Sequence, residues 1–266
     1  MKKYLVLVSA LLLLAACGGS PASDDSSSSQ ESSTSASSNS SQTKESSKQS
    51  EITKQSTSST TTTASQEAAG DTELQQVYPN EQTPAVSAVG NAQTISIAAN
   101  EANNALTVSY YNTESKLPLN DQQLQNQTPI AQFQRTTYAS AEEARAAVAP
   151  AFDGGGQAVD LGYNITGYQQ SGAGSSYLSW QEGNWNLTVQ AININGEDPV
   201  PLAQKAVEYL ETAFLPVPKE AGQISLSVTG GGYESNVVAW QVGNTVYKTM
   251  HTDALSSLQM AVSMNS

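Results

Sequence analysis

The chain has 266 residues, of which 24 are acidic and 11 are basic, so its formal net charge at pH 7 is −13. A charge of this sign argues against binding to nucleic acid or to anionic lipid head groups, because both would repel the protein. The chain contains one cysteine. An intramolecular disulfide is therefore excluded, and the folded part must be stabilised by its own core.

The first twenty residues have the layout of an export signal. Lys2 and Lys3 form a positive start, and residues 4–14 form an apolar run that is too short to span a bilayer. Small residues and the single cysteine follow, in the order Leu14-Ala15-Ala16-Cys17. An ordinary secretory signal is the alternative interpretation, since its cleavage site also uses small residues.

The stretch that ends at Cys17 resembles the lipobox of bacterial lipoproteins. The resemblance implies that a signal peptide at residues 1–16 is removed and that the cysteine sulfur carries a diacylglycerol. Two acyl chains suffice for stable anchoring, because each buried methylene contributes about 0.8 kcal/mol. We therefore expect Cys17 to be the lipidation site of a protein anchored on the extracytoplasmic face of the cell membrane.

Residues 18–66 are dominated by serine and threonine, and Ile52 is their only large aliphatic residue. This composition predicts a disordered tether, because too little apolar surface is available to offset the entropy of ordering. The tether and the two glycines after Cys17 resemble those of Gram-positive surface lipoproteins. We assign residues 17–90 to the lipidated cysteine and its linker and residues 91–266 to a globular domain, with order beginning near Thr94.

Strand and helix patterns alternate after Thr94. Period-2 alternation and turn residues predict strands, which cover residues 94–98, 105–111, 130–138, 160–169, 176–181, 186–194, 224–228, 237–241 and 245–250. A capping box at Ser140 and Glu143 opens a helix predicted at residues 139–152. Apolar stripes predict a second helix at residues 199–214 and a third that is capped by Asp253.

Two segments of the domain have nearly the same local sequence. Trp180-Gln181-Glu182-Gly183-Asn184 and Trp240-Gln241-Val242-Gly243-Asn244 each lie between two strands that precede a helix. The repeat indicates a duplication, although chance also explains matches of this length. The whole pattern predicts an α+β fold, with antiparallel hairpins forming a sheet and about three helices packed on one face of it. Residues 162–266 resemble uncharacterised domains of Gram-positive lipoproteins, a resemblance that implies no activity.

Aromatic residues near the hairpins are the candidate ligand-binding residues. Six aromatic residues would stack on sugar rings or on another protein if they were exposed on a sheet face, namely Trp180, Trp185, Trp240, Tyr177, Tyr233 and Tyr247. Of these, we select Trp180, Trp185, Trp240 and Tyr233 as the possible ligand-binding residues. The alternative is that they form the core between sheet and helices. Leu178 shares a strand face with Trp180, which favours burial of that tryptophan, and Trp185 beside the turn is the one expected to be exposed.

No catalytic or metal-binding constellation stands out. The chain has a single histidine, His251, which lies near the start of a predicted helix. The sequence contains no Gly-x-Ser-x-Gly motif that would supply a serine nucleophile for it. Oxygen ligands around Gly196 allow a Ca²⁺ site, but their spacing differs from that of an EF-hand, and the sequence favours an exposed turn that joins a strand to a helix. These ligands are Asn193, Asn195, Glu197 and Asp198. The pairs Glu142–Glu143 and Glu208–Glu211 could act as the two carboxylates of a glycoside hydrolase. Both pairs lie on predicted helix surfaces, where solvent-exposed charge is the alternative explanation.

The sequence therefore favours a non-enzymatic, membrane-anchored lipoprotein whose domain binds a cell-wall or envelope component. A hydrolase that uses carboxylates to act on the wall or on peptides is the first alternative, and a solute-binding receptor is the second. We expect no cofactor, no metal ion and no nucleic-acid partner. The membrane, reached through the lipid on Cys17, is the expected point of attachment.

Overall fold

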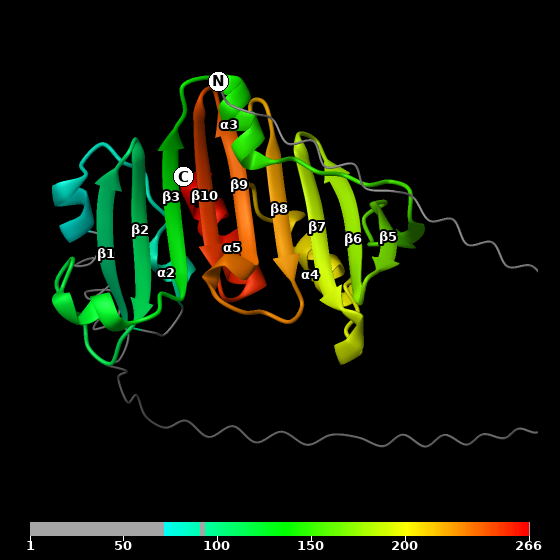
Figure 1. Ribbon diagram of the computed structural model, residues 1–266, viewed down its shortest axis with the longest axis horizontal. Coiled ribbons are helices and arrows are strands. Elements are labelled where there is room, and N and C mark those ends of the chain that lie inside the picture. Colours follow the sequence, from blue (N-terminus) through cyan, green and yellow to red (C-terminus); the bar gives the residue numbers. More distant parts are fainter. Residues whose placement is uncertain (1–71, 91–93, 266) are drawn as a thin grey trace, which may run out of the picture. The chain divides into compact units, whose positions relative to one another are not determined.

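The computed structural model describes residues 72–90 and 94–265 (Figure 1). The predicted signal peptide, Cys17 and most of the predicted linker lie outside these residues. Within the described residues, no helix has both the length and the apolar composition that crossing a bilayer requires.

The described residues form one ten-stranded sheet (Figure 1). Its strands are β1 (Ile95–Ala102), β2 (Ala105–Asn112), β3 (Ala131–Thr137), β4 (Gln157–Asp160), β5 (Thr166–Gly172), β6 (Ser175–Glu182), β7 (Trp185–Ile192), β8 (Gly222–Ser227), β9 (Asn236–Val242) and β10 (Thr245–His251). Their spatial order is β1-β2-β3-β10-β9-β8-β7-β6-β5-β4. All neighbours are antiparallel except β7 and β8, which run parallel.

The helical segments are short. They are residues 72–77, α2 (Val86–Val89), α3 (Ala141–Val148), α4 (Val200–Leu210) and α5 (Ala254–Val262), with 3-10 turns η1 (Gln122–Asn126), η2 (Asn193–Asn195), η3 (Tyr233–Ser235) and η4 (Ser263–Asn265). Helix α4 connects the two parallel strands, because a parallel pair needs a crossover and cannot be joined by a hairpin. Ser140 and Glu143 form the predicted capping interaction of α3, and Asp253 caps α5.

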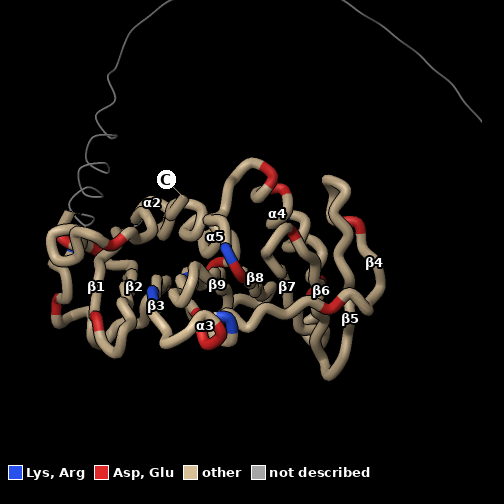
Figure 2. Tube along the Cα trace, turned by 90° about the horizontal axis from the view of Figure 1, so that it is seen from above, with Lys and Arg blue, Asp and Glu red and all other residues tan. Residues whose placement is uncertain are grey.

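The predicted α+β class, with about three helices packed on the sheet, is wrong. The described part of the chain has a β-rich fold in which one mostly antiparallel sheet dominates and the few helices are short. These helices do not form one layer: α2, α4 and α5 lie on one face of the sheet, whereas α3 lies on the other (Figure 2). Local patterns located most of the elements but contained no information on which strands pair or on which face a helix packs.

We call the two sides of the sheet the helical face, which carries α2, α4 and α5, and the open face, which carries α3. The main core lies on the helical face and includes Phe133, Trp180, Leu187, Ile224 and Trp240. A small second core lies under α3, where Ala144 and Val148 pack on the sheet. Most apolar strand side chains therefore point toward the helical face.

The ordered region also includes residues on the N-terminal side of the boundary predicted at residue 91. Leu74, Val86 and Val89 are buried in the main core. Arg135 on β3 forms ion pairs with Glu81, at 2.8 Å, and with Glu101 on β1, at 3.2 Å. Residues 72–90 are thus part of the folded unit.

The sequence repeat is also a repeat of structure. Trp180 on β6 pairs with Leu187 on β7, and Trp240 on β9 pairs with Tyr247 on β10, seven residues further along the chain in both cases. Each hairpin is followed by a helix, α4 or α5, on the helical face (Figure 2). Both tryptophans point to that face and are buried.

Candidate functional site

The open face of strands β5 to β8 carries mainly uncharged polar side chains. Pairing between the strands places on this face Tyr168, Gln170, Tyr177, Ser179, Gln181, Asn186, Thr188, Gln190, Gln223, Ser225 and Ser227. Side chains alternate between the two faces along each strand, so the apolar residues point to the helical face and these polar residues point to the open face. In a protein of net charge −13, this surface is distinguished by having hydroxyl, amide and phenol groups but no carboxylate.

A segment at residues 149–156 crosses this part of the open face, and we call it the strap. Helix α3 ends because Ala149 adopts a left-handed conformation, with φ of 50°, and Pro150 follows it. The Ala151 amide then donates a hydrogen bond of 2.8 Å to Oε1 of Gln223, which ties the strap to β8. The predicted helix at 139–152 is therefore shorter, and its last residues form the strap.

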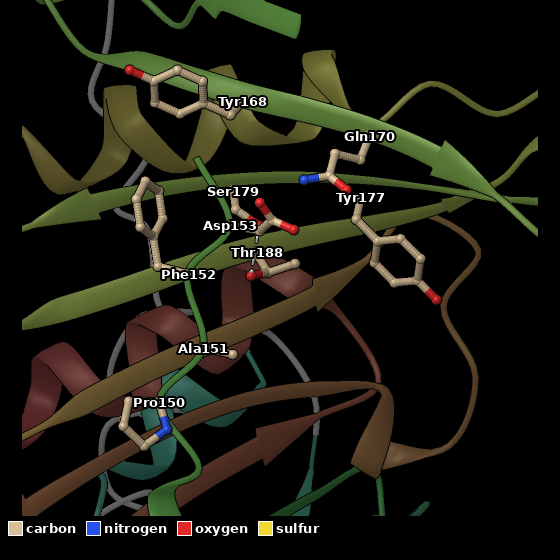
Figure 3. A pocket seen from close by; sticks show the side chains of 9 residues that line it. All are labelled: Pro150, Ala151, Phe152, Asp153, Tyr168, Gln170, Tyr177, Ser179 and Thr188. Atoms are coloured by element: carbon tan, nitrogen blue, oxygen red, sulfur yellow. Dashed lines mark hydrogen bonds between the residues drawn. The ribbon is translucent and has the colours of Figure 1, made fainter. Parts of the chain in front are cut away.

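A pocket of about 440 Å³ lies between the strap and the sheet (Figure 3). Its lining residues are Pro150, Ala151, Phe152 and Asp153 of the strap, Tyr168 and Gln170 of β5, Tyr177 and Ser179 of β6, and Thr188 of β7. Its volume falls within the range of small-molecule sites, and its aromatic walls with a few polar groups match their usual chemistry. We call it the strap pocket.

Aromatic rings stand at both ends of the strap pocket (Figure 3). Phe152 and Tyr168 pack edge to face, with ring centroids 6.0 Å apart and planes at 75°. Tyr177 lies on the other side, and its hydroxyl accepts a hydrogen bond of 3.2 Å from Nε2 of Gln190. Phe152 and Tyr177 are 40% and 43% exposed. Their rings therefore offer apolar surface to a ligand without any rearrangement of the core.

Polar groups lie between these rings. The hydroxyls of Ser179 and Thr188 are 3.2 Å apart. Asp153 is exposed, and hydrogen bonds from the Gly155 amide and from the Gln170 side chain hold the pKa of its carboxyl below the ordinary value. Asp153 is therefore ionised at neutral pH, and its carboxylate is available to accept hydrogen bonds from hydroxyl groups of a ligand.

The predicted ligand-binding tryptophans do not lie in this pocket. Trp180, Trp185 and Trp240 are at most 8% exposed, and all three belong to the main core. The prediction that Trp180 is buried is confirmed. The prediction that Trp185 is exposed is wrong, because β8 lies beside β7 and α4 covers the helical face at this point.

Among the four selected residues, Tyr233 is the one that is partly exposed. It lies in η3, and its side chain forms hydrogen bonds with Glu234 and Gln132. Gln132 donates to Ser109 on the neighbouring strand, at 3.1 Å, and belongs to the open face. Burial is the main reason why the pKa of Tyr233 lies above its usual range, and Glu234 adds to the effect. Tyr233 thus borders the open face but is separate from the strap pocket.

The single histidine, which was considered as a catalytic base, takes part in hydrogen bonds within the fold. His251 is buried, its Nδ1 accepts from the Asp253 amide at 2.7 Å, and its Nε2 lies 2.9 Å from the Val89 carbonyl oxygen. Desolvation lowers the pKa of its imidazole, so the ring is neutral at pH 7. Both ring nitrogens are occupied, which leaves neither available to act as a general base.

The side-chain oxygen atoms of the loop around Gly196, between β7 and α4, accept hydrogen bonds from the protein itself. The Glu197 carboxylate accepts from the Ile192 amide, the Thr229 hydroxyl and the Asn195 side chain, and these bonds, in that order of importance, lower its pKa. Asn193 accepts from Ser176, and Asp198 accepts from the Val200 amide. In residues 72–90 and 94–265, no three His, Cys, Asp or Glu side chains are grouped for metal binding.

The carboxylate pairs lie on helix surfaces, as expected for solvated charge. Glu142, Glu143, Glu208 and Glu211 are all exposed, and none of them lines the strap pocket. That pocket holds one carboxylate, Asp153, whose pKa is lowered. Glycoside hydrolysis requires two carboxyl groups, one of which must retain its proton near neutral pH. The strap pocket therefore holds one of the two carboxyl groups that this reaction uses.

Sequence reasoning named Tyr177 among the hairpin aromatics but did not identify the strap pocket. The rule that assigned Trp180 to the core also assigns its neighbours Tyr177 and Ser179 to the opposite face. The contribution of the strap depends on where the chain runs after α3, which no local pattern indicates. No protein-family model, curated protein or solved structure matches this chain.

Proposed function

We propose that this protein is a lipid-anchored, extracytoplasmic binding protein of the bacterial cell envelope and that its strap pocket binds an uncharged glycan. The observation that carries the glycan assignment is the grouping of partly exposed aromatic rings with hydroxyl, amide and carboxylate acceptors on an uncharged sheet face. Sugar rings have apolar faces that pack on aromatic side chains and hydroxyl edges that need hydrogen-bond partners. Acidic polymers are disfavoured, because Asp153 and the net charge of the protein repel them.

A glycan array followed by calorimetry tests this assignment. The detergent-solubilised lipoprotein is screened against neutral and acidic oligosaccharides, and hits are titrated with the Phe152→Ala and Tyr177→Ala variants. Each variant loses one ring and should weaken binding by about tenfold, which corresponds to about 1.4 kcal/mol. Tyr163→Ala is the matched control, because Tyr163 is 58% exposed and lies outside the pocket. Binding to acidic glycans only, or equal losses in all three variants, would contradict the proposal.

The lipid anchor rests on the lipobox-like stretch that ends at Cys17 and requires a separate test. In the native host, we expect the wild-type protein to partition into the detergent phase of Triton X-114 extracts and Cys17→Ala to appear in the aqueous phase or the medium. The cause is the loss of both acyl chains, which together supply the membrane affinity of a lipidated protein. Ser20→Ala is the control and should behave like the wild type. Unchanged partitioning and processing of Cys17→Ala would refute the anchor.

A further inference from the structure

A second pocket lies on the helical face, where the β6–β7 hairpin meets the end of α4. It has a volume of about 200 Å³, and its walls are apolar except for one carboxylate, that of Glu182. Trp185 and Phe214 supply aromatic surface, and Phe214 is 76% exposed. We call this site the hairpin pocket. It lies on the opposite face of the sheet from the strap pocket, so the inference drawn from it is independent of glycan binding.

The carboxylate of Glu182 is held in place but is not neutralised by a cation. Its Oε1 accepts a hydrogen bond of 2.7 Å from Nε1 of Trp180. Across the described residues, ion pairs within 4.0 Å are formed by Arg135 with its two glutamates, and none involves Glu182. Burial is the main cause of a raised pKa at Glu182, the Trp180 hydrogen bond opposes it, and the charge of Glu211 adds to it. A cation bound beside Glu182 would remove this cost of ionisation.

Three further features of the hairpin pocket favour positive charge. Leu210 and Ala213 line it, so the C-terminal end of α4, with its partial negative charge, lies at the pocket. Glu211 is close enough to Glu182 to raise the pKa of that residue. Trp185 and Phe214 line the pocket, and aromatic rings attract ammonium groups that lie over their faces.

We propose that the hairpin pocket binds a small organic ammonium ion, a primary or quaternary amine on a short apolar stem. The apolar walls contact the stem, and the carboxylate of Glu182 pairs with the charged nitrogen. Inorganic cations are poor occupants, because the pocket offers one carboxylate and few other oxygen ligands to replace their hydration shell. The backbone of β8 fixes Trp185, since Gly222 has no side chain to displace its ring.

Calorimetric titration of the detergent-solubilised lipoprotein with n-butylammonium and tetramethylammonium tests the proposal. n-Butanol serves as the neutral analogue, and KCl is held at matched ionic strength. We expect both ammonium ions to bind, n-butanol to bind at least tenfold more weakly, and Glu182→Gln to weaken ammonium binding at least tenfold. The glutamine keeps an acceptor for Trp180 and removes only the charge. Glu208→Gln is the matched control, because Glu208 lies exposed on α4, outside the pocket, and should leave binding unchanged.

If n-butanol bound as tightly as n-butylammonium, the pocket would recognise only the apolar stem and not the charge, which would overturn the proposal. Equal losses in Glu182→Gln and Glu208→Gln would assign the effect to overall negative charge and would also overturn it, as would no detectable binding by the folded wild type. If Glu182→Gln unfolds, Phe214→Ala provides the test, since that ring is largely exposed and its loss should weaken ammonium binding severalfold. Unchanged affinity in folded Phe214→Ala would then refute the site.

Discussion

Replacing Trp180 with alanine should destabilise the fold by about 3–5 kcal/mol, the range found when large aromatic residues are removed from a packed core. Trp180 is 1% exposed and packs in the main core on the helical face. Its removal leaves a cavity and takes away the hydrogen bond to Glu182. Because a domain of this size is stable by only about 5–15 kcal/mol, the loss is a large fraction of the total.

The control for this prediction lies three residues earlier on the same strand. Tyr177 points to the open face and is 43% exposed, so Tyr177→Ala should cost less than about 1 kcal/mol. Urea unfolding followed by circular dichroism measures both variants. If the two substitutions cost the same, the assignment of opposite faces to these residues of β6 is incorrect, and with it the separation of core and binding surface.

The contrast within β6 also explains which parts of the fold were predictable. Alternation along a strand is local, so Leu178 and Trp180 could be assigned to the core from sequence alone. The capping residues Ser140 and Asp253 could also be predicted from the sequence, because a helix cap involves only the first turn of its helix. The turn between β6 and β7, at Gly183 and Asn184, is a local feature of the same kind, because it depends only on adjacent residues.

Long-range pairing was not predictable in this way. The sheet places β3, near the start of the domain, beside β10 at its end, and it joins two repeated hairpins through a parallel pair. No residue within either strand indicates its partner. The same limitation hid the strap pocket, whose strap and sheet residues are brought together only when α3 packs on the open face. The error in the predicted fold class has this origin.

Trp185 shows how one such contact changes the role of a residue. Beside a turn, the residue has the local features of an exposed aromatic. In the fold, its ring lies against the backbone of Gly222 on β8, and the ring of Trp240 lies 6.5 Å away. The glycine is required here for space rather than for an unusual torsion angle. Sequence reasoning about Trp185 failed because Gly222 is 37 residues further along the chain.

Gly222→Ala should therefore destabilise the protein by about 1–3 kcal/mol, the usual cost of overpacking. A Cβ atom at this position would collide with the Trp185 ring, and the ring is too well packed to move aside freely. Gly172→Ala is the matched control, because a Cβ there meets nothing within 4 Å, and its cost should stay within about 0.5 kcal/mol. Urea unfolding measures both variants.

A double-mutant cycle decides whether the Trp185 ring is the cause. In a Trp185→Leu background the obstructing ring is absent, so Gly222→Ala should cost almost nothing, and the two substitutions should deviate from additivity by at least about 1 kcal/mol. Additive effects would mean that the alanine disturbs the β7–β8 pairing itself. The same variants bear on the hairpin pocket, because displacing the ring of Trp185 removes one of its walls. A folded Gly222→Ala protein should accordingly bind n-butylammonium more weakly than the wild type, whereas Gly172→Ala should not.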